Sequence, residues 1–177
     1  MNLKKIKIIG AIGIFLLCFL THYIYEWFQN DLFAIFFPVN ESIWEHMKML
    51  FTSILLYSII EYLLLHYYKM EYNNFLWAVF IMAFMSIIIF LTLYMPIHYI
   101  IGYSFIASLI ILFITTCIVQ LIGYYVLKYY KNNIKMIPII LISICYIIFG
   151  YLTYYPPKTE LFYDQKNEKY GINNYNI

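Results

Sequence analysis

The stretch FLWAVFIMAFMSIIIFLTLYM, residues 75–95, contains no charged side chain. A helix rises about 1.5 Å per residue, so a run of this length crosses the roughly 30 Å hydrocarbon core of a bilayer. Its apolar residues are continuous and do not alternate with polar ones, which argues against a strand. Backbone groups in lipid must hydrogen-bond to one another, and a helix achieves this within one segment. The stretch therefore predicts a transmembrane helix.

Similar apolar runs lie on both sides of this one. The five predicted helices cover residues 8–28, 43–65, 75–95, 102–127 and 137–155. We therefore expect an all-α fold, a polytopic transmembrane helical bundle of about five helices, over residues 1–155. A polar external tail containing one turn is expected over residues 156–177, which is too short for a domain.

The composition also indicates a membrane protein. Of the 177 residues, 64% are hydrophobic and only 11% are charged, whereas soluble domains are about half apolar. The lipid bilayer is therefore the predicted partner. The formal net charge of +2 and the lack of a basic stripe exclude nucleic acid as a partner. The three cysteines lie within apolar runs and indicate neither disulfides nor a thiolate zinc site.

The lysines predict how the bundle is oriented. They are more frequent at the helix ends on the side of the N-terminus than at the opposite ends. Positive residues concentrate on the cytoplasmic side of membrane proteins, so we expect the N-terminus inside and the C-terminus outside. All basic residues other than histidine are lysine, a bias that indicates a bacterial source and therefore a multi-pass protein of the cell membrane.

Ionisable residues gather at one level of the predicted bundle. The first helix runs outward and carries His22 and Glu26, and the second begins in the segment PVNESIWEHMK, residues 38–48. A charged side chain at a helix centre costs about 2.5–3.5 kcal/mol to insert, so such residues indicate function. If the two helices form an antiparallel hairpin, this pair faces Glu45 and His46. These four residues are candidate catalytic groups and candidate ligands of a divalent metal.

Helix entry offers a simpler explanation for part of this segment. Ser42 and Glu45 are spaced as a capping box, and Asn40 is an alternative cap. Glu41 is favoured near a helix N-terminus by the macrodipole, and Lys48 can pair with Glu45 or extend to the interface. These four residues, Asn40, Glu41, Ser42 and Lys48, are therefore interpreted as helix entry and support. Capping does not account for the two histidines or for the acidic residue of the first helix.

Other polar residues are weaker signals. Glu61 and Gln120 lie at a similar depth in the inner half of the bundle, and we expect an interhelical hydrogen bond between them. His98, which follows Pro96, is a candidate to join the outer cluster. Proline lacks the backbone N–H, so we expect Pro96 to end the third helix.

Two segments carry a resemblance to a known family. The segment FFPVNESIWEHMKMLF, residues 36–51, follows a helix that ends in His22-x-x-x-Glu26-Trp27 and resembles the signature of a domain-of-unknown-function family of small bacterial membrane proteins. The stretch YPPKTELFYDQKNEKYG, residues 155–171, is similar to that family's C-terminal segment. The resemblance covers nearly the whole chain. It implies a multi-pass cell-membrane protein and no established chemistry.

Three functions fit these residues. In a membrane-embedded enzyme, the four candidate groups would bind a divalent metal or act as acid and base on a lipid, peptide or isoprenoid substrate. In a transport or ion-binding protein, the same groups would line a vestibule that Glu61 and Gln120 continue inward, and a homodimer would be needed. In an accessory subunit, a partner membrane protein would supply the activity. The sequence contains no known zinc-protease or nucleophile-elbow motif.

Overall fold

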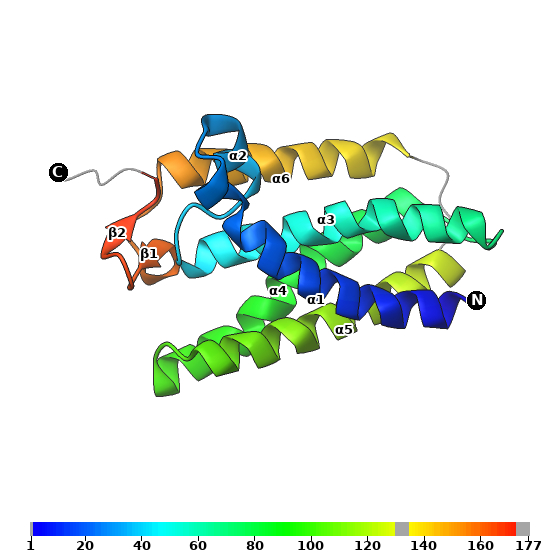
Figure 1. Ribbon diagram of the computed structural model, residues 1–177, viewed down its shortest axis with the longest axis horizontal. Coiled ribbons are helices and arrows are strands. Elements are labelled where there is room, and N and C mark those ends of the chain that lie inside the picture. The colour runs from blue at the N-terminus through cyan, green and yellow to red at the C-terminus, as the bar shows by residue number, and fades with distance from the viewer. Residues whose placement is uncertain (1, 130–134, 173–177) are drawn as a thin grey trace.

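The computed structural model describes residues 2–129 and 135–172. Within this part the chain forms six α-helices, a 3-10 turn and one two-stranded hairpin (Figure 1). In chain order the elements are α1 (Leu3–Trp27), α2 (Asp31–Phe36), α3 (Ile43–Tyr67), α4 (Phe75–Ile101), α5 (Phe105–Tyr129), α6 (Met136–Tyr154), η1 (Glu160–Phe162), β1 (Tyr163–Asp164) and β2 (Lys169–Tyr170).

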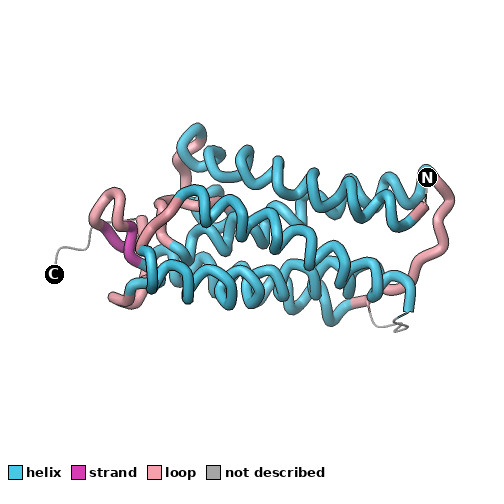
Figure 2. The backbone as a smooth tube through the Cα atoms, turned by 90° about the horizontal axis from the view of Figure 1, so that it is seen from below, coloured by secondary structure: helices cyan, strands magenta, loops and turns pink. Residues whose placement is uncertain are grey.

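The long helices form one bundle. Among the described residues, five helices are long and apolar enough to cross a membrane, and the short α2 is not. They run along a common direction, with the N-terminus at one end and the C-terminal hairpin at the other (Figures 1 and 2). We call the latter the tail end of the bundle. The predicted all-α transmembrane fold is confirmed, and the protein is a multi-pass membrane protein. Which end faces the cytoplasm stays a prediction.

Helix α3 is the central element of the bundle. More than half of its most apolar stretch is buried within the protein, against a third or less in the other four spanning helices. It packs against both α1 and α4. It also has the lowest mean hydropathy of the five, because its buried face carries polar side chains. Polar groups in a membrane protein avoid lipid, so the least apolar helix occupies the interior.

Helix α4 is longer than predicted. It continues through Pro96 to Ile101 and ends at Gly102, whose backbone N–H bonds to the carbonyl of His98 at 2.8 Å. The prediction that Pro96 ends this helix is therefore wrong. Proline removes one intrahelical hydrogen bond, whereas ending the helix there would leave several backbone groups unpaired in lipid. Gly102 has a φ of +72°, a conformation that glycine adopts without strain.

The connection between the first two predicted helices contains α2. Asn30 caps this helix, and its Oδ1 accepts a hydrogen bond from the backbone N–H of Phe33 at 3.0 Å. The helix packs against α6, and Thr52 of α3 donates to the carbonyl of Phe36 at 2.7 Å. Six residues are too few to be recognised by an apolar run of membrane-spanning length. The connection between these two spanning helices is therefore a structured element.

The C-terminal segment folds back onto the tail end of the bundle. In the hairpin, Tyr163 pairs with Tyr170 and Asp164 with Lys169, and the predicted turn connects the two strands. Phe162 of η1 is buried, and its ring centroid lies 4.9 Å from that of Trp44 in α3. The described part of the predicted tail is thus packed against the helices; residues 173–177 of that prediction lie outside the described residues.

Candidate metal centre

The segment before α3 is tied to the C-terminal hairpin. Asn40 Nδ2 donates to the carbonyl of Gly171 at 3.0 Å, and the backbone N–H of Glu41 donates to Asp164 Oδ2 at 3.1 Å. The other oxygen of Asp164, which is fully buried, accepts from the backbone N–H of Lys166 at 3.0 Å. Gly171 has a φ of +57°. The hairpin therefore determines where Glu41 lies.

Ser42 is the N-cap of α3. Its hydroxyl accepts a bond from the backbone N–H of Glu45 at 3.4 Å, while Asn40 Oδ1 accepts from the N–H of Ser42 at 2.9 Å. Of the two caps considered from the sequence, Ser42 is the one used. The side chain of Glu45 does not return to the Ser42 N–H, so only half of the expected capping box forms. This start of α3 places His46 in its first turn, beside α1.

Three ligand-type side chains converge at the tail end. Glu41 Oε2 lies 3.3 Å from His22 Nε2 of α1 and 3.7 Å from His46 Nε2 of α3. One possible ligand atom from each residue lies within 4.8 Å of the other two. Among the described residues, this is the one group of three or more histidine, cysteine or acidic side chains close enough to share a metal ion.

Backbone contacts determine the tautomer of His46. Its Nδ1 lies 2.9 Å from the carbonyl oxygen of Ser42, which can only accept, so Nδ1 carries the proton. In the neutral ring, Nε2 then presents its lone pair towards the carboxylate of Glu41. Two acceptors facing each other at 3.7 Å repel unless a proton on Nε2 or a metal ion lies between them. Histidines that ligate metals use this same arrangement, with one ring nitrogen bonded to a carbonyl and the other free.

Glu41 carries a negative charge. Its pKa is lowered to about 2, chiefly by the hydrogen bond with His22, although partial burial opposes the shift. Lys166 Nζ contributes by pairing with the other carboxylate oxygen, Oε1, at 3.2 Å, and the pKa of Lys166 is raised in return. The carboxylate is therefore ionised at neutral pH, as a metal ligand must be.

The geometry is compatible with a zinc-like ion. Ligands about 2.1 Å from a tetrahedral centre lie roughly 3.4 Å apart. The two separations from Glu41 are close to this value, and the two imidazole nitrogens lie within 4.8 Å of each other. Two imidazoles and one carboxylate are a ligand set of catalytic zinc sites, in which water takes the fourth position. The side chains of His22, Glu41 and His46 are 20%, 20% and 23% exposed, so the centre is reachable.

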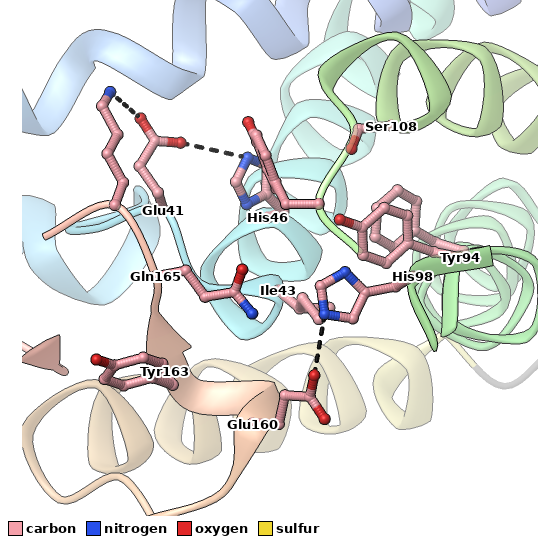
Figure 3. Close-up of a pocket in the computed structure, with 12 residues that line it drawn as sticks. Glu41, Ile43, His46, Tyr94, His98, Ser108, Glu160, Tyr163 and Gln165 are labelled. Carbon is pink, nitrogen blue, oxygen red and sulfur yellow. Dashed lines mark hydrogen bonds and ion pairs between the residues drawn. The ribbon is translucent and has the colours of Figure 1, made fainter. Parts of the chain in front are cut away.

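Two cavities meet at this centre. One, of about 360 Å³, is lined by His46, and the other, of about 380 Å³, is lined by His22. Glu41 and Lys166 line both. Figure 3 shows Glu41 and His46 at the first cavity, which we call the aromatic cavity because Phe90, Tyr94 and Tyr103 line it. An ion held by the three ligands would therefore face two spaces of small-molecule size.

A second histidine lies in the wall of the aromatic cavity. His98 is 6% exposed, and its Nε2 lies 3.1 Å from Glu160 Oε1 of the C-terminal segment (Figure 3). Its Nδ1 is buried and has no hydrogen-bond partner among the described residues. When Nε2–H donates to Glu160, Nδ1 keeps a free lone pair. His98 thus shares a cavity with His46 without belonging to the three converging ligands.

Glu45 belongs to a different network. It forms a buried ion pair with Lys48 at 2.5 Å, and both side chains are 1% exposed or less. Its oxygens also accept from Thr153 of α6 at 3.0 Å and from the backbone N–H of Val39 at 3.1 Å. Lys48 further donates to the carbonyl of Ala34 at the end of α2 at 2.7 Å. This network joins α2, α3 and α6 and engages both oxygens of Glu45.

The four candidate catalytic residues are therefore divided by the structure. His22 and His46 converge, whereas Glu45 lies in the buried network and Glu26 is an exposed residue at the second cavity. Glu41, interpreted from the sequence as helix support, provides the carboxylate. Glu41 precedes the first helical residue, so helical spacing does not predict where its side chain lies. Its position is set by the hydrogen bond from its backbone N–H to Asp164, which is distant in the sequence.

A second polar group lies near the other end of the bundle. Gln120 Nε2 donates to Glu61 Oε2 at 3.5 Å, which is the contact expected from the sequence. Lys7 of α1 adds an ion pair with Glu61 at 2.5 Å, and all three residues are buried. A Cβ on Gly123 would lie 2.7 Å from Lys7 Nζ, so this glycine leaves room for the ammonium group.

Fold and site together define a class, a multi-pass helical membrane protein with a cluster of two histidines and a glutamate at one end. The model of a family of unknown function, DUF6512, matches residues 1–172, and the chain belongs to this family. The resemblance to a domain-of-unknown-function family is thereby confirmed. A comparison with curated proteins finds no match, and neither does a comparison with solved structures. Chemistry must be inferred from the site itself.

Proposed function

We propose that the protein is a membrane-embedded, metal-dependent hydrolase. His22, Glu41 and His46 are the ligands of one zinc-like ion at the tail end of the bundle. The convergence of two imidazole Nε2 atoms on one carboxylate oxygen, at 3.3 and 3.7 Å, carries this proposal. Three such ligands leave a coordination position for water. A bound divalent ion lowers the pKa of that water and makes it a nucleophile near neutral pH.

Residues around the aromatic cavity supply the other parts of a hydrolytic site. The free Nδ1 of His98 can accept or return a proton, because Glu160 holds the ring through Nε2. Lys166 presents an ammonium group beside Glu41, where negative charge on a reacting carbonyl or phosphoryl oxygen would be stabilised. These groups come from α4 and from the C-terminal segment, so the hairpin takes part in the site.

A transport path between the two polar groups is less well supported. On α1, Ile14 and Cys18 lie between Lys7 and His22, and on α3, Leu50 and Ile54 separate His46 from Glu61. These four separating side chains are at most 1% exposed and belong to one apolar cluster. Ions do not cross a packed apolar layer without a large desolvation cost. The outer cluster therefore fits a reaction site better than the start of a channel.

Metal content tests this proposal directly. The full chain is purified in detergent and dialysed against a slight excess of zinc. We expect it to retain about one zinc ion per chain, measured by elemental mass spectrometry. His22→Ala and His46→Ala should each weaken binding by more than the 10- to 100-fold that loss of an outer-sphere partner costs. His66→Ala is the matched control, because His66 is an exposed histidine on the same helix as His46.

Two results would contradict the proposal. One is a folded wild-type chain without stoichiometric metal. The other is zinc retention by both histidine variants at the level of the His66 control. Thermal unfolding of each variant separates loss of a ligand from loss of the fold.

A further inference from the structure

The aromatic cavity is lined by both ionisable and apolar residues. Glu41, His46 and Lys166 line the part next to the candidate metal, while Ile43 of α3 and Phe90 of α4 are among its apolar residues. A site with both kinds of lining suits a molecule with a polar head and an apolar body. Its volume of about 360 Å³ lies in the range of small-molecule sites.

The elements beside this cavity expose apolar side chains. Ile100 and Ile101 end α4, and Phe105 and Ile106 begin α5; each is more than half exposed. In Figure 1 this corner of α4 and α5 stands apart from the C-terminal hairpin. Exposed side chains of this kind on a membrane-spanning hairpin contact lipid. Tyr103, in the connection between the two helices, lines the cavity itself, so the cavity lies next to the lipid-facing surface.

Residues of the C-terminal segment form one side of the cavity. Tyr163, Gln165 and Lys166 line it from the hairpin. Figure 3 shows Tyr163 and Gln165 across the cavity from Ser108 of α5. Lys166 is the cationic residue among them, and it already pairs with the carboxylate of Glu41. A head group with a negatively charged or polarised oxygen would find the ammonium group and the metal on the same side.

We propose that the substrate is an amphiphile from the surrounding leaflet, with its reactive oxygen at the metal beside Lys166 and its apolar chain in the aromatic cavity. This inference rests on the metal-dependent function proposed above. It follows from the mixed polar and apolar lining of the cavity and from the apolar surface next to it. An acyl or other alkyl chain satisfies the requirement, and a fully polar substrate does not.

Alkyl hydroxamates test the inference, because their head group chelates zinc and their chain length can be varied. Burial of one methylene group is worth about 0.8 kcal/mol, or roughly a fourfold gain in affinity. Octanohydroxamate has six more methylene groups than acetohydroxamate. We therefore expect it to bind the zinc-loaded full chain at least 100-fold more tightly, even if only part of the octanoyl chain is buried.

Cavity-filling variants separate the cavity from general partition into detergent. Ser108→Phe places a ring in the aromatic cavity, and Gln165→Trp fills it from the hairpin side. Ser143→Phe is the matched control, because Ser143 is exposed on α6 and makes the same kind of hydroxyl bond to a helix carbonyl as Ser108 does. Both filling variants should lower the preference for the longer chain at least tenfold, and the control should not.

The outcomes distinguish the two proposals. Zinc bound normally, with an unchanged chain-length preference in both filling variants, would overturn the amphiphile inference and leave the metal centre intact. Absence of zinc from the wild-type chain would overturn the metal proposal itself. If one filling variant fails to fold, the other decides, because the two substitutions lie on different walls of the cavity.

Discussion

The buried pair of Glu45 and Lys48 provides the sharpest test of how the tail end is built. Lys48 Nζ makes an ion pair with Glu45 and donates to Thr153 Oγ1 at 2.8 Å, in addition to the carbonyl of Ala34. We predict that Lys48→Met destabilises the protein and leaves zinc binding within about threefold of wild type. The methionine removes the ammonium group and keeps most of the side-chain volume, so packing is little changed.

The expected size follows from the burial of both groups. Removing one partner of a buried ion pair costs about 3–5 kcal/mol, because the other charge is left uncompensated. In a soluble domain of this length, 1 kcal/mol shifts the melting temperature by about 2–4 °C, so a decrease of roughly 6–20 °C is expected. The double variant with Glu45→Leu should recover part of this loss, because it leaves no buried charge in the pair.

Thermal unfolding in detergent measures the effect, with Lys158→Met as the control, since Lys158 is exposed beyond the last spanning helix. Unfolding of Lys48→Met within about 2 °C of the control would show that the buried ion pair does not stabilise the tail end. Loss of zinc from Glu45→Gln with unchanged stability would also contradict this role, because Glu45 would then act as a metal ligand, as considered from the sequence.

Three further predictions concern charge, the hairpin and orientation. Because the pKa of Glu41 is lowered in the folded protein, its ionised form adds stability that is present above the ordinary glutamate pKa near 4.3 and is lost as the pH falls through about 2. The difference in unfolding free energy between wild type and Glu41→Gln should therefore shrink between pH 5 and pH 2. This difference should stay below about 1 kcal/mol, because the carboxylate is only half-buried. A difference that does not change with pH would contradict the ion-pair account. Asp164→Ala removes the carboxylate that holds the backbone of Glu41, so zinc affinity should fall about 10- to 100-fold while the helical circular dichroism is retained; unchanged affinity would show that the hairpin does not position the ligand. If the N-terminus lies in the cytoplasm, Lys158→Cys should react with an impermeant maleimide added to intact cells and Glu71→Cys in the opposite loop should not; the reverse pattern would invert the orientation.

The fold could be predicted because its signals are local. A continuous apolar run predicts each spanning helix, because the backbone groups of such a run in lipid must hydrogen-bond within the segment. The N-cap at Ser42 was one of two local solutions, and the pair of Glu61 with Gln120 followed from matching depths. Pro96 shows where local prediction fails. Proline disfavours a helix, yet the helix continues through it because unpaired backbone groups in lipid would cost more.

The carboxylate of the candidate site could not be predicted from local sequence. Three acidic residues, Glu26, Glu41 and Glu45, lie at the right level, and spacing favoured the two that lie on helices. Which of them meets the histidines depends on the rotation of α3 against α1 and on the bonds made by a hairpin more than 120 residues away. Glu45 forms a buried ion pair with Lys48, and Asp164 accepts a hydrogen bond from the backbone of Glu41 beside the imidazoles.

A bundle of membrane-spanning helices with histidines at one level could be inferred from the amino-acid sequence, because apolar length and helical position are properties of single segments. Three features depend on long-range packing: which carboxylate joins the histidines, the closure of the site by the C-terminal segment, and the pair of Lys7 with Glu61. Those contacts join segments far apart in the chain, and their energies depend on packing that no single segment contains.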